Sequence, residues 1–372
     1  MPGCTGGWTP SGTRSGPCDR ENEQKHSLSL HDIKLGVEPL VAHSSATCLR
    51  GKLKTMYKTG FYTHPDCSRH EMGHGHPECP QRLDAIRDRL LVSGVGLGLT
   101  ELEAPEASLS DVELAHDRMH VAALRGMSDR LREELAAGGP EHAAIDPDTL
   151  INAHTWSAAL RSAGAAVAAT DAVMAGELRN AFCAVRPPGH HASRAKASGF
   201  CFFNNVAIAA KHALERHGLK RVAVVDFDVH HGNGTEDILS GDDRVLMVSF
   251  FQHPFYPYSG TEHPATNMVN VPVPAYTRGM DIRGLVEDVW VPRLEAHRPE
   301  LIFISAGFDA HREDDMGQLG LVESDYAWIT QRLVQLADRH SQGRIVSCLE
   351  GGYSLSALGR SVEAHVRVLA DL

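Results

Sequence analysis

Apolar runs of strand length alternate with segments of helical period from residue 56 onward. Six short apolar runs predict β-strands at residues 60–63, 181–185, 222–225, 245–250, 301–305 and 344–349. Periodic segments predict helices at residues 81–92, 121–137, 156–175, 203–216, 281–297, 325–340 and 355–370. Apolar strands that alternate with helices are typical of α/β proteins, in which both faces of a mostly parallel sheet are covered. The pattern therefore predicts a central parallel sheet with helices on both faces.

Residues 1–55 differ in composition from the rest of the chain. They are rich in Gly, Ser, Thr and charged residues and show no sustained period, as is typical of segments that bury too little apolar surface to fold. We expect a low-complexity, poorly ordered extension at 1–55 and one folded domain at 56–372. Met56 directly precedes the first strand-like run. We therefore expect that translation can begin at Met56 and that the extension is dispensable.

The composition excludes some classes of partner. The net charge of −11 argues against binding to nucleic acid, because phosphate neutralisation needs clustered basic residues. No apolar stretch reaches the roughly 20 residues of a membrane span, and the N-terminus has no apolar export signal. The eight cysteines form no CxxC pair and are interpreted as reduced thiols. Together these features predict a cytoplasmic protein.

Polar, chemically reactive residues directly follow four of the predicted strands. In open α/β sheets, ligands bind outside the carboxyl ends of the strands. The four segments are 187–191, which contains two histidines, 228–230, Asp309, and 350–353, which contains Tyr353. The sequence therefore predicts that these segments meet at one edge of the sheet.

A metal site is the first interpretation of this edge. Asp226, Asp228 and His230 project to the same side because side chains alternate along a strand. Two carboxylates and an imidazole in one buried place need a cation. Asp309 can complete a three-ligand set with Asp228 and His230, which leaves a position open for water. The alternative is that Asp309 caps the next helix.

The paired histidines suggest acid–base chemistry. His190 and His191 follow a rigid diproline turn. Asp226 is too early on its strand to be an obvious ligand, so we assign it as the partner that orients one imidazole. Asn233, in the loop that follows, can orient the other without adding charge, which favours that imidazole as a base near pH 7. A solvated or structural histidine pair is the alternative.

Tyr353 follows two glycines in the last of the four segments. Its hydroxyl can donate to an oxyanion that develops during a reaction. A surface tyrosine after a turn is the alternative.

Five motifs in order and spacing resemble the zinc-dependent histone deacetylases, in particular their class II branch, and the bacterial histone deacetylase-like amidohydrolases. The resemblance covers residues 56–372. The motifs are Pro187-Pro-Gly-His-His191, Gly199-Phe-Cys-Phe-Phe-Asn204, Asp226-Phe-Asp-Val-His-His-Gly-Asn-Gly234, Ala306-Gly-Phe-Asp309 and Glu350-Gly-Gly-Tyr353. It implies a single catalytic domain with the three-layer αβα arginase–deacetylase fold, whose central sheet has about eight strands.

The resemblance also implies roles for individual residues. It implies one Zn²⁺ held by Asp228, His230 and Asp309, His190 and His191 as the catalytic pair, and Tyr353 as the group that polarises the acyl carbonyl. The Gly199 carbonyl would hold the substrate amide N–H. A structural K⁺ would be held by Asp226, Asp228, His230, Ser249 and the Phe250 carbonyl.

Four positions refine the resemblance. Asn233 resembles the class II branch. Phe200 and Tyr256 fall where two aromatic residues wall the acyl-lysine tunnel, and tyrosine makes the second wall more polar than usual. Met316 occupies the position where the polyamine-deacetylating branch carries a glutamate, which favours acyl-lysine. The nearby acidic residues Glu313, Asp314 and Asp315 keep an acidic rim in consideration.

The expected function is removal of acyl groups, such as acetyl, from the side-chain amine of lysine or a similar amine by metal-activated water. The expected partners are thus acyl-lysine peptides or proteins, or acylated small amines; an oligomer stays open. Acetylpolyamine deacetylation is the alternative. A two-Mn²⁺ ureohydrolase of the same fold is disfavoured because Gly232 and His311 stand where further carboxylates would be needed. A non-catalytic acyl-peptide binding module has no use for His190, His191 and Tyr353 together.

Overall fold

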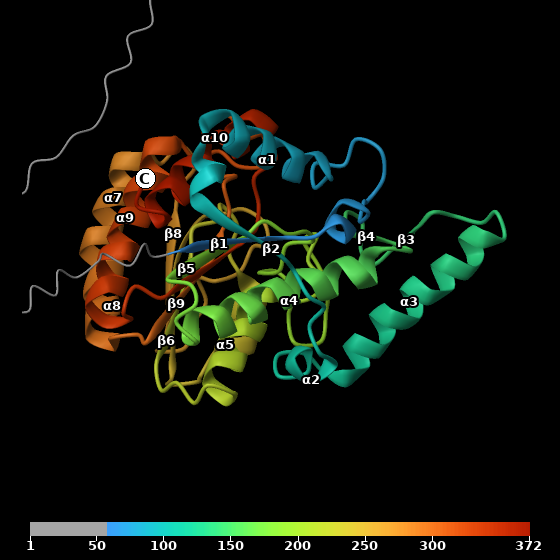
Figure 1. Cartoon of the computed structure of the whole chain (residues 1–372), viewed down its shortest axis with the longest axis horizontal. Helices are drawn as coiled ribbons and strands as arrows, with labels where there is room; N and C mark the ends of the chain where they lie inside the picture. The colour runs from blue at the N-terminus through green and yellow to red at the C-terminus, as the bar shows by residue number, and fades with distance from the viewer. Residues whose placement is uncertain (1–57) are drawn as a thin grey trace, which may run out of the picture. The chain divides into compact units, whose positions relative to one another are not determined.

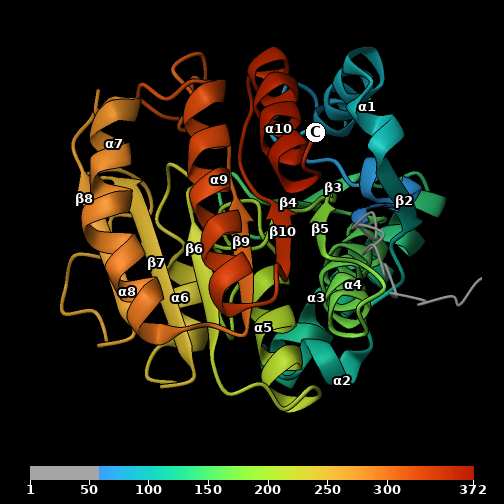
Figure 2. The same cartoon turned by 60° about the vertical axis from the view of Figure 1, so that its left-hand side comes forward.

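The computed structural model describes residues 58–372, so the predicted extension and the boundary after residue 55 lie outside the described residues. The described residues contain an eight-stranded sheet with the order β2-β1-β5-β10-β9-β6-β7-β8 (Figures 1 and 2). All its strand pairs are parallel. The strands are β1 (Thr59–Thr63), β2 (Leu99–Glu103), β5 (Asn180–Cys183), β6 (Val222–Asp226), β7 (Val245–Gln252), β8 (Met268–Val273), β9 (Leu301–Ala306) and β10 (Ile345–Leu349).

The six predicted strands all lie in this sheet, and the two strands that the pattern missed are its edges. β2 is partly exposed along its whole length, and three of the six residues of β8 are not buried. An edge strand is covered less than a central one, so it lacks the continuous apolar run that reveals a buried strand. A separate antiparallel pair, β3 (His142–Ala144) and β4 (Leu150–Asn152), was also not predicted.

Helices cover both faces of the sheet, which confirms the predicted three-layer arrangement. Figure 2 shows α7 to α10 and α1 on one face, with α3, α4 and α5 on the other. The helices are α1 (Gln81–Ser93), α2 (Leu109–Val112), α3 (Arg118–Ala136), α4 (Thr155–Met174), α5 (Asn205–Glu215), α6 (Asn233–Leu239), α7 (Gly279–Leu285), α8 (Val291–His297), α9 (Glu323–His340) and α10 (Leu355–Leu369), with 3₁₀ turns at Pro65–Ser68 and Val95–Gly98. Among residues 58–372, every helix is too short or too polar to span a bilayer.

The single helix predicted at 281–297 is interrupted. A π-helical turn, Val286–Trp290, separates α7 from α8, and the Val291 N–H donates to the Val286 carbonyl five residues back. Pro292 at the start of α8 has no N–H to donate, so the regular hydrogen-bond ladder is broken beside it.

Four strands that are distant in the sequence are neighbours in the centre of the sheet. β5, β10, β9 and β6 lie side by side, and all point the same way. They are the four strands that reactive residues follow. The order of the sheet therefore brings the four segments to one edge, as the sequence predicts.

Candidate metal centre and catalytic histidines

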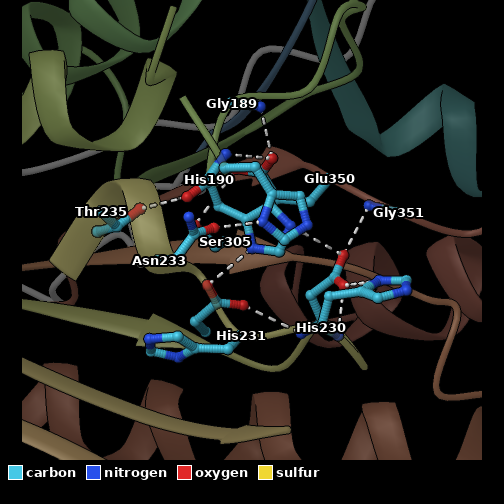
Figure 3. Close-up of polar contacts among 12 residues, drawn as sticks. Gly189, His190, His230, His231, Asn233, Thr235, Ser305, Glu350 and Gly351 are labelled. Carbon is cyan, nitrogen blue, oxygen red and sulfur yellow. Dashed lines mark hydrogen bonds and ion pairs between the residues drawn. The ribbon is translucent and has the colours of Figure 1, made fainter. Parts of the chain in front are cut away.

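Asp228, His230 and Asp309 meet beyond the carboxyl ends of β6 and β9. His230 Nδ1 lies 3.0 Å from Asp228 Oδ1 and 3.2 Å from Asp309 Oδ2. All three side chains are buried, and their ligand atoms lie within 4.8 Å of one another. The chain thus supplies two carboxylate oxygens and one imidazole nitrogen to a single point, and Figure 3 shows His230 at this place. Borderline divalent metals such as zinc accept this set of ligands.

Two further observations test whether these residues fit a metal ion. Asp309 Oδ2 is buried and makes no hydrogen bond, although His230 Nδ1 is near. A buried carboxylate oxygen without a partner is costly unless a cation meets it. A Cβ added at Gly351 would collide with Asp309 Oδ2 and approach Asp228 Oδ2, so glycine keeps this space clear. Asp228, His230 and Asp309 therefore fit a divalent metal ion.

Each of the adjacent histidines has its own partner. His190 Nδ1 lies 3.0 Å from Asp226 Oδ2, and His191 Nδ1 lies 2.7 Å from Asn233 Oδ1. Glycine is required at 232 because a Cβ there would collide with Asp226 Oδ2. The sequence suggested that Asn233 lies in a loop, but Asn233 is the first residue of α6. A helix start fixes its position more firmly than a loop would.

The two partners separate the pKa values of the histidines. Burial lowers the pKa of His190, but the carboxylates of Asp228 and Asp226 outweigh it and raise that pKa well above its usual value. Burial and the neighbouring His190 hold the pKa of His191 well below its usual value. One imidazole is therefore set to carry charge and the other to accept a proton.

Glu350 was named in the sequence only as part of a motif, yet it holds the histidine turn in place. Its Oε2 accepts the backbone N–H of Gly189 at 2.7 Å and of His190 at 3.1 Å, and its Oε1 accepts the Ser305 hydroxyl (Figure 3). Burial raises the pKa of Glu350 to about 7. No pattern in the sequence identifies this pairing, because it joins two strands that are far apart in the chain.

Tyr353 lies at the same edge, on the turn after β10. Its backbone N–H donates to the buried carboxylate of Asp314, and the guanidinium of Arg82 lies 4.9 Å from its ring centroid. Burial and the charge of Asp309 raise the pKa of the Tyr353 hydroxyl well above its usual value, against the opposing effect of Arg82. The hydroxyl is therefore a hydrogen-bond donor over the whole physiological pH range.

One cavity of about 200 Å³ opens onto this group of residues. All four residues predicted to bind substrate line it. The lining residues are Asp148, His191, Gly199, Phe200, His230, Phe255, Tyr256, Asp315, Met316 and Tyr353.

Two lining residues were not singled out from the sequence. Phe255 stacks on His230 with ring centroids 5.5 Å apart, and its place in the aromatic run beside Tyr256 was a usable signal. Asp148 precedes β4 in the unpredicted strand pair, and no pattern in the sequence marks it.

The three acidic residues that left an acidic rim in consideration have different surroundings. Asp314 is buried and accepts backbone N–H groups, while Glu313 pairs with Arg360 at 2.7 Å. Only Asp315 lines the cavity.

Two of the residues predicted to hold potassium face each other across neighbouring strands. Ser249 on β7 lies directly opposite Asp226 on β6. The Ser249 hydroxyl is buried and has no hydrogen-bond partner, and Phe250 follows it on the buried strand. An unpartnered buried oxygen beside a carboxylate is compatible with a bound cation.

Gly232 and His311, the two positions that disfavour a two-manganese site, lie outside the ligand set. Gly232 packs against Asp226, and His311 is buried with its Nε2 3.6 Å from Glu323, outside the ligand set. Among the described residues, the group at this edge that could hold a metal ion consists of Asp228, His230 and Asp309.

Comparison with known proteins identifies the family. The profile described as "Histone deacetylase domain" matches residues 76–369. The chain belongs to the histone deacetylase family. Its members include proteins named as deacetylases and amidohydrolases. These names support the removal of acyl groups as the activity of the family.

The histone deacetylase family includes close relatives in archaea and bacteria. The chain is 38% identical to a "Probable deacetylase" of Archaeoglobus fulgidus, over 80% of this chain and 82% of that protein. It is also 38% identical to the "Histone deacetylase-like amidohydrolase" of Pseudomonas aeruginosa, over 75% of this chain and 73% of that one.

Other relatives are longer. The chain is 39% identical to "Polyamine deacetylase HDAC10" of Mus musculus over 78% of its own length, but the match spans 44% of that protein. The match to "Type-2 histone deacetylase 2" of Dictyostelium discoideum spans 21% of that protein. The "Crystal Structure of HDA15 HD domain" superposes with a TM-score of 0.77 at 33% identity, over 85% of this chain and 89% of that one. The histone deacetylase fold predicted from the motifs is thereby confirmed.

Proposed function

We propose that this chain is a zinc-dependent amidohydrolase that removes acyl groups, such as acetyl, from the side-chain amine of lysine. The observation that carries the proposal is the pair of histidines with different partners beside a three-ligand metal site. Asp228, His230 and Asp309 would hold Zn²⁺. When bound, zinc supplies a Lewis acid that lowers the pKa of bound water to about 7 and polarises an acyl oxygen.

His191 acts as the proton acceptor. Its Nδ1 donates to the Asn233 side-chain oxygen, so Nε2 carries the lone pair. Nε2 takes a proton from the attacking water and delivers one to the leaving amine. His190, held beside Asp226, stays cationic and stabilises the negative charge that develops. The Tyr353 hydroxyl donates to the oxyanion of the tetrahedral intermediate.

The cavity walls position the substrate. Phe200 and Tyr256 flank the aliphatic part of the acylated side chain, and the Gly199 carbonyl accepts the amide N–H. Gly199 and Phe200 both have positive φ, of 53° and 68°, which turns the backbone at this place. A Cβ at Gly199 would lie 2.5 Å from a His191 ring carbon. We include a structural K⁺ held by Asp226, Asp228, His230, Ser249 and the Phe250 carbonyl, supported by the unpartnered Ser249 hydroxyl.

The test is a panel of acylated amines with the zinc-loaded chain. We expect release of acetate from acetyl-lysine peptides, loss of turnover on removal of zinc, and recovery when zinc is returned. Metal content measured by mass spectrometry accompanies each sample. Turnover of guanidino substrates with two bound Mn²⁺ would contradict the proposal, as would no hydrolysis of any acyl-lysine, acylpolyamine or aryl amide by folded, zinc-loaded protein.

Acetylpolyamine deacetylation is the second candidate, because the carboxylates of Asp148 and Asp315 line the cavity and can attract a second amine. Met316 lines it too and is uncharged. We predict that Met316→Glu raises the ratio of kcat/KM for acetylspermidine over acetyl-lysine peptide about fivefold, as for an ion pair of about 1 kcal/mol. Met316→Gln is the size-matched control. A wild-type enzyme that already prefers acetylspermidine would make this candidate the first.

A further inference from the structure

We propose a second, non-catalytic site for a divalent transition metal, formed by Asp171, His212 and His217 at the ends of α4 and α5. Asp171 lies in the last turn of α4, His212 in the last turn of α5, and His217 two residues beyond α5. The ligand atoms of the three residues lie within 4.8 Å of one another. Two imidazoles and a carboxylate are a donor set that zinc, cobalt and nickel accept.

One oxygen atom is the centre of this group. Asp171 Oδ1 lies 2.8 Å from His212 Nε2 and 2.7 Å from His217 Nε2. The spacing resembles that of the catalytic group, where the contacts of His230 Nδ1 with carboxylate oxygens are 3.0 and 3.2 Å. Two ligand atoms on a tetrahedral zinc lie about 3.3 Å apart, so a bound ion would need about half an ångström more separation between these side chains.

His212 supplies an independent argument. Its second ring nitrogen, Nδ1, lies 3.1 Å from Asp111 Oδ1, so carboxylate oxygens face both nitrogens of one buried ring. A neutral imidazole has one N–H and cannot donate to both, so the ring is either doubly protonated or bound to an ion at one nitrogen. A metal ion at Nε2 removes this conflict, because Nδ1–H then donates to Asp111 while Nε2 binds the ion. A carboxylate behind a metal-binding histidine is the usual arrangement.

The surroundings of the group also suit a cation. The C-terminal end of a helix carries partial negative charge, and both α4 and α5 end here. Asp111 itself is held by the Ser108 hydroxyl and by Arg216 at 3.6 Å. The Asp171 and His217 side chains are 53% and 26% exposed, so the ion can enter from solvent and water can complete its coordination.

The site is separate from the catalytic group. α5 begins immediately after the motif that supplies Gly199 and runs away from the cavity, so His212 lies roughly 10 Å along it at 1.5 Å per residue. An ion bound there would fasten α4 to the end of α5, with Asp111 of α2 behind it. We therefore expect the ion to stabilise these three helices and to leave catalysis unchanged.

The test is metal stoichiometry of the full chain. Protein equilibrated with buffered Zn²⁺, and separately with Co²⁺, is freed of unbound metal and analysed by mass spectrometry of metals against protein concentration. We expect two ions per chain in the wild type and one in His217→Ala and in Asp171→Asn. His340→Ala, which breaks a partly buried histidine–carboxylate pair with Glu295, is the matched control and should keep two.

Thermal unfolding of the zinc-loaded proteins is the second readout. We expect the two site variants to lose a few degrees in unfolding midpoint relative to His340→Ala, with turnover of any acyl substrate unchanged. One ion per chain in the wild type would overturn the proposal, as would two ions in His217→Ala. If the variants fail to fold, anomalous scattering at the zinc edge from wild-type crystals decides, with no peak at His212 contradicting the site.

Discussion

Two buried charged clusters lie close together in this protein and differ in how completely their polar atoms are paired. We call Glu78, Arg82 and Arg186 the arginine cluster, and Asp228, His230 and Asp309 the ligand cluster. In the arginine cluster, which is fully buried, Glu78 pairs with both guanidinium groups, and every side-chain nitrogen and oxygen has a partner. In the ligand cluster, Asp309 Oδ2 makes no hydrogen bond and has only the His230 ring nitrogen near it, at 3.2 Å. Complete pairing indicates a structural role, and an unpaired buried ligand atom indicates a binding role.

The arginine cluster also supports the turn that carries Tyr353. Arg82 donates to the carbonyls of Gly352, at 2.7 Å, and of Glu350, and its guanidinium lies against the Tyr353 ring. Arg186 directly precedes the Pro187–Pro188 turn and donates to the carbonyls of Cys67 and His70. The paired cluster therefore fixes two of the segments that carry reactive groups.

The largest effect should follow from breaking the arginine cluster. Glu78→Ala leaves two buried guanidinium groups unpaired, and we expect it to lower the free energy of unfolding by about 3–5 kcal/mol. Urea unfolding of the zinc-loaded protein measures this. Glu113→Ala, which removes an ion pair with the exposed Arg118, should cost less than about 1 kcal/mol. Equal losses in the two variants would refute the distinction between the clusters.

The opposite result is expected at Tyr353, which lines the cavity and which we propose contacts the substrate, but which is not needed for pairing within the arginine cluster. Tyr353→Phe should lower kcat by 10²–10³, about 3 kcal/mol in the barrier, while the free energy of unfolding changes by less than about 0.5 kcal/mol. Steady-state kinetics with an acetyl-lysine peptide and urea unfolding give the two values. Tyr258→Phe, at an exposed position, is the control and should leave kcat unchanged.

The clusters should respond to pH in opposite directions. Burial raises the pKa of Glu78, but Arg186 outweighs it and holds that pKa at about 2. Its stabilisation is therefore complete above pH 4.5 and is lost as the pH falls toward 2. Burial and Asp228 raise the pKa of Asp309 to about 7. In metal-free protein the folded state then binds the extra proton, so stability is lost as the pH rises from about 4 to 7.

We expect this loss in metal-free protein to be about 2 kcal/mol. Unfolding free energies at pH 5 and 7.5 measure it. Asp309→Asn should reduce the slope between these two values and should prevent zinc binding at this site. A metal-free protein that gains stability between pH 5 and 7.5 would show that the ligand cluster carries no excess negative charge.

The smallest effect concerns the histidine partners. Asn233→Asp places a carboxylate beside His191 and should raise its pKa, which moves the acidic limb of the kcat/KM profile upward by about one pH unit. pH–rate profiles of the zinc-loaded wild type and variant check this, and His340→Ala serves as a control that leaves the limb in place. An unmoved acidic limb would remove His191 as the proton acceptor.

The sequence by itself predicted the elements whose side chains are uniformly covered. Four strands are buried along their whole length, namely β5, β6, β9 and β10. Their apolar runs could therefore be recognised in the sequence. It also predicted the reactive residues that follow these strands, because each group lies within a few positions in the chain. The edge strands and the short β3 and β4 pair lacked such runs, since solvent or loops cover one side.

What only the tertiary structure decided is which distant groups meet. The order β5-β10-β9-β6 placed Asp309 beside His230 and Glu350 beneath His190. The tertiary structure also showed that Asp314 is buried while Asp315 faces the cavity. The packing of the helices brought Asp171 to His212 and His217. Local periodicity records which side of an element is buried. It does not record which other element packs against that buried side. The pairings between strands and between helices, and the Asp309 oxygen that makes no hydrogen bond, could therefore not be predicted from the sequence.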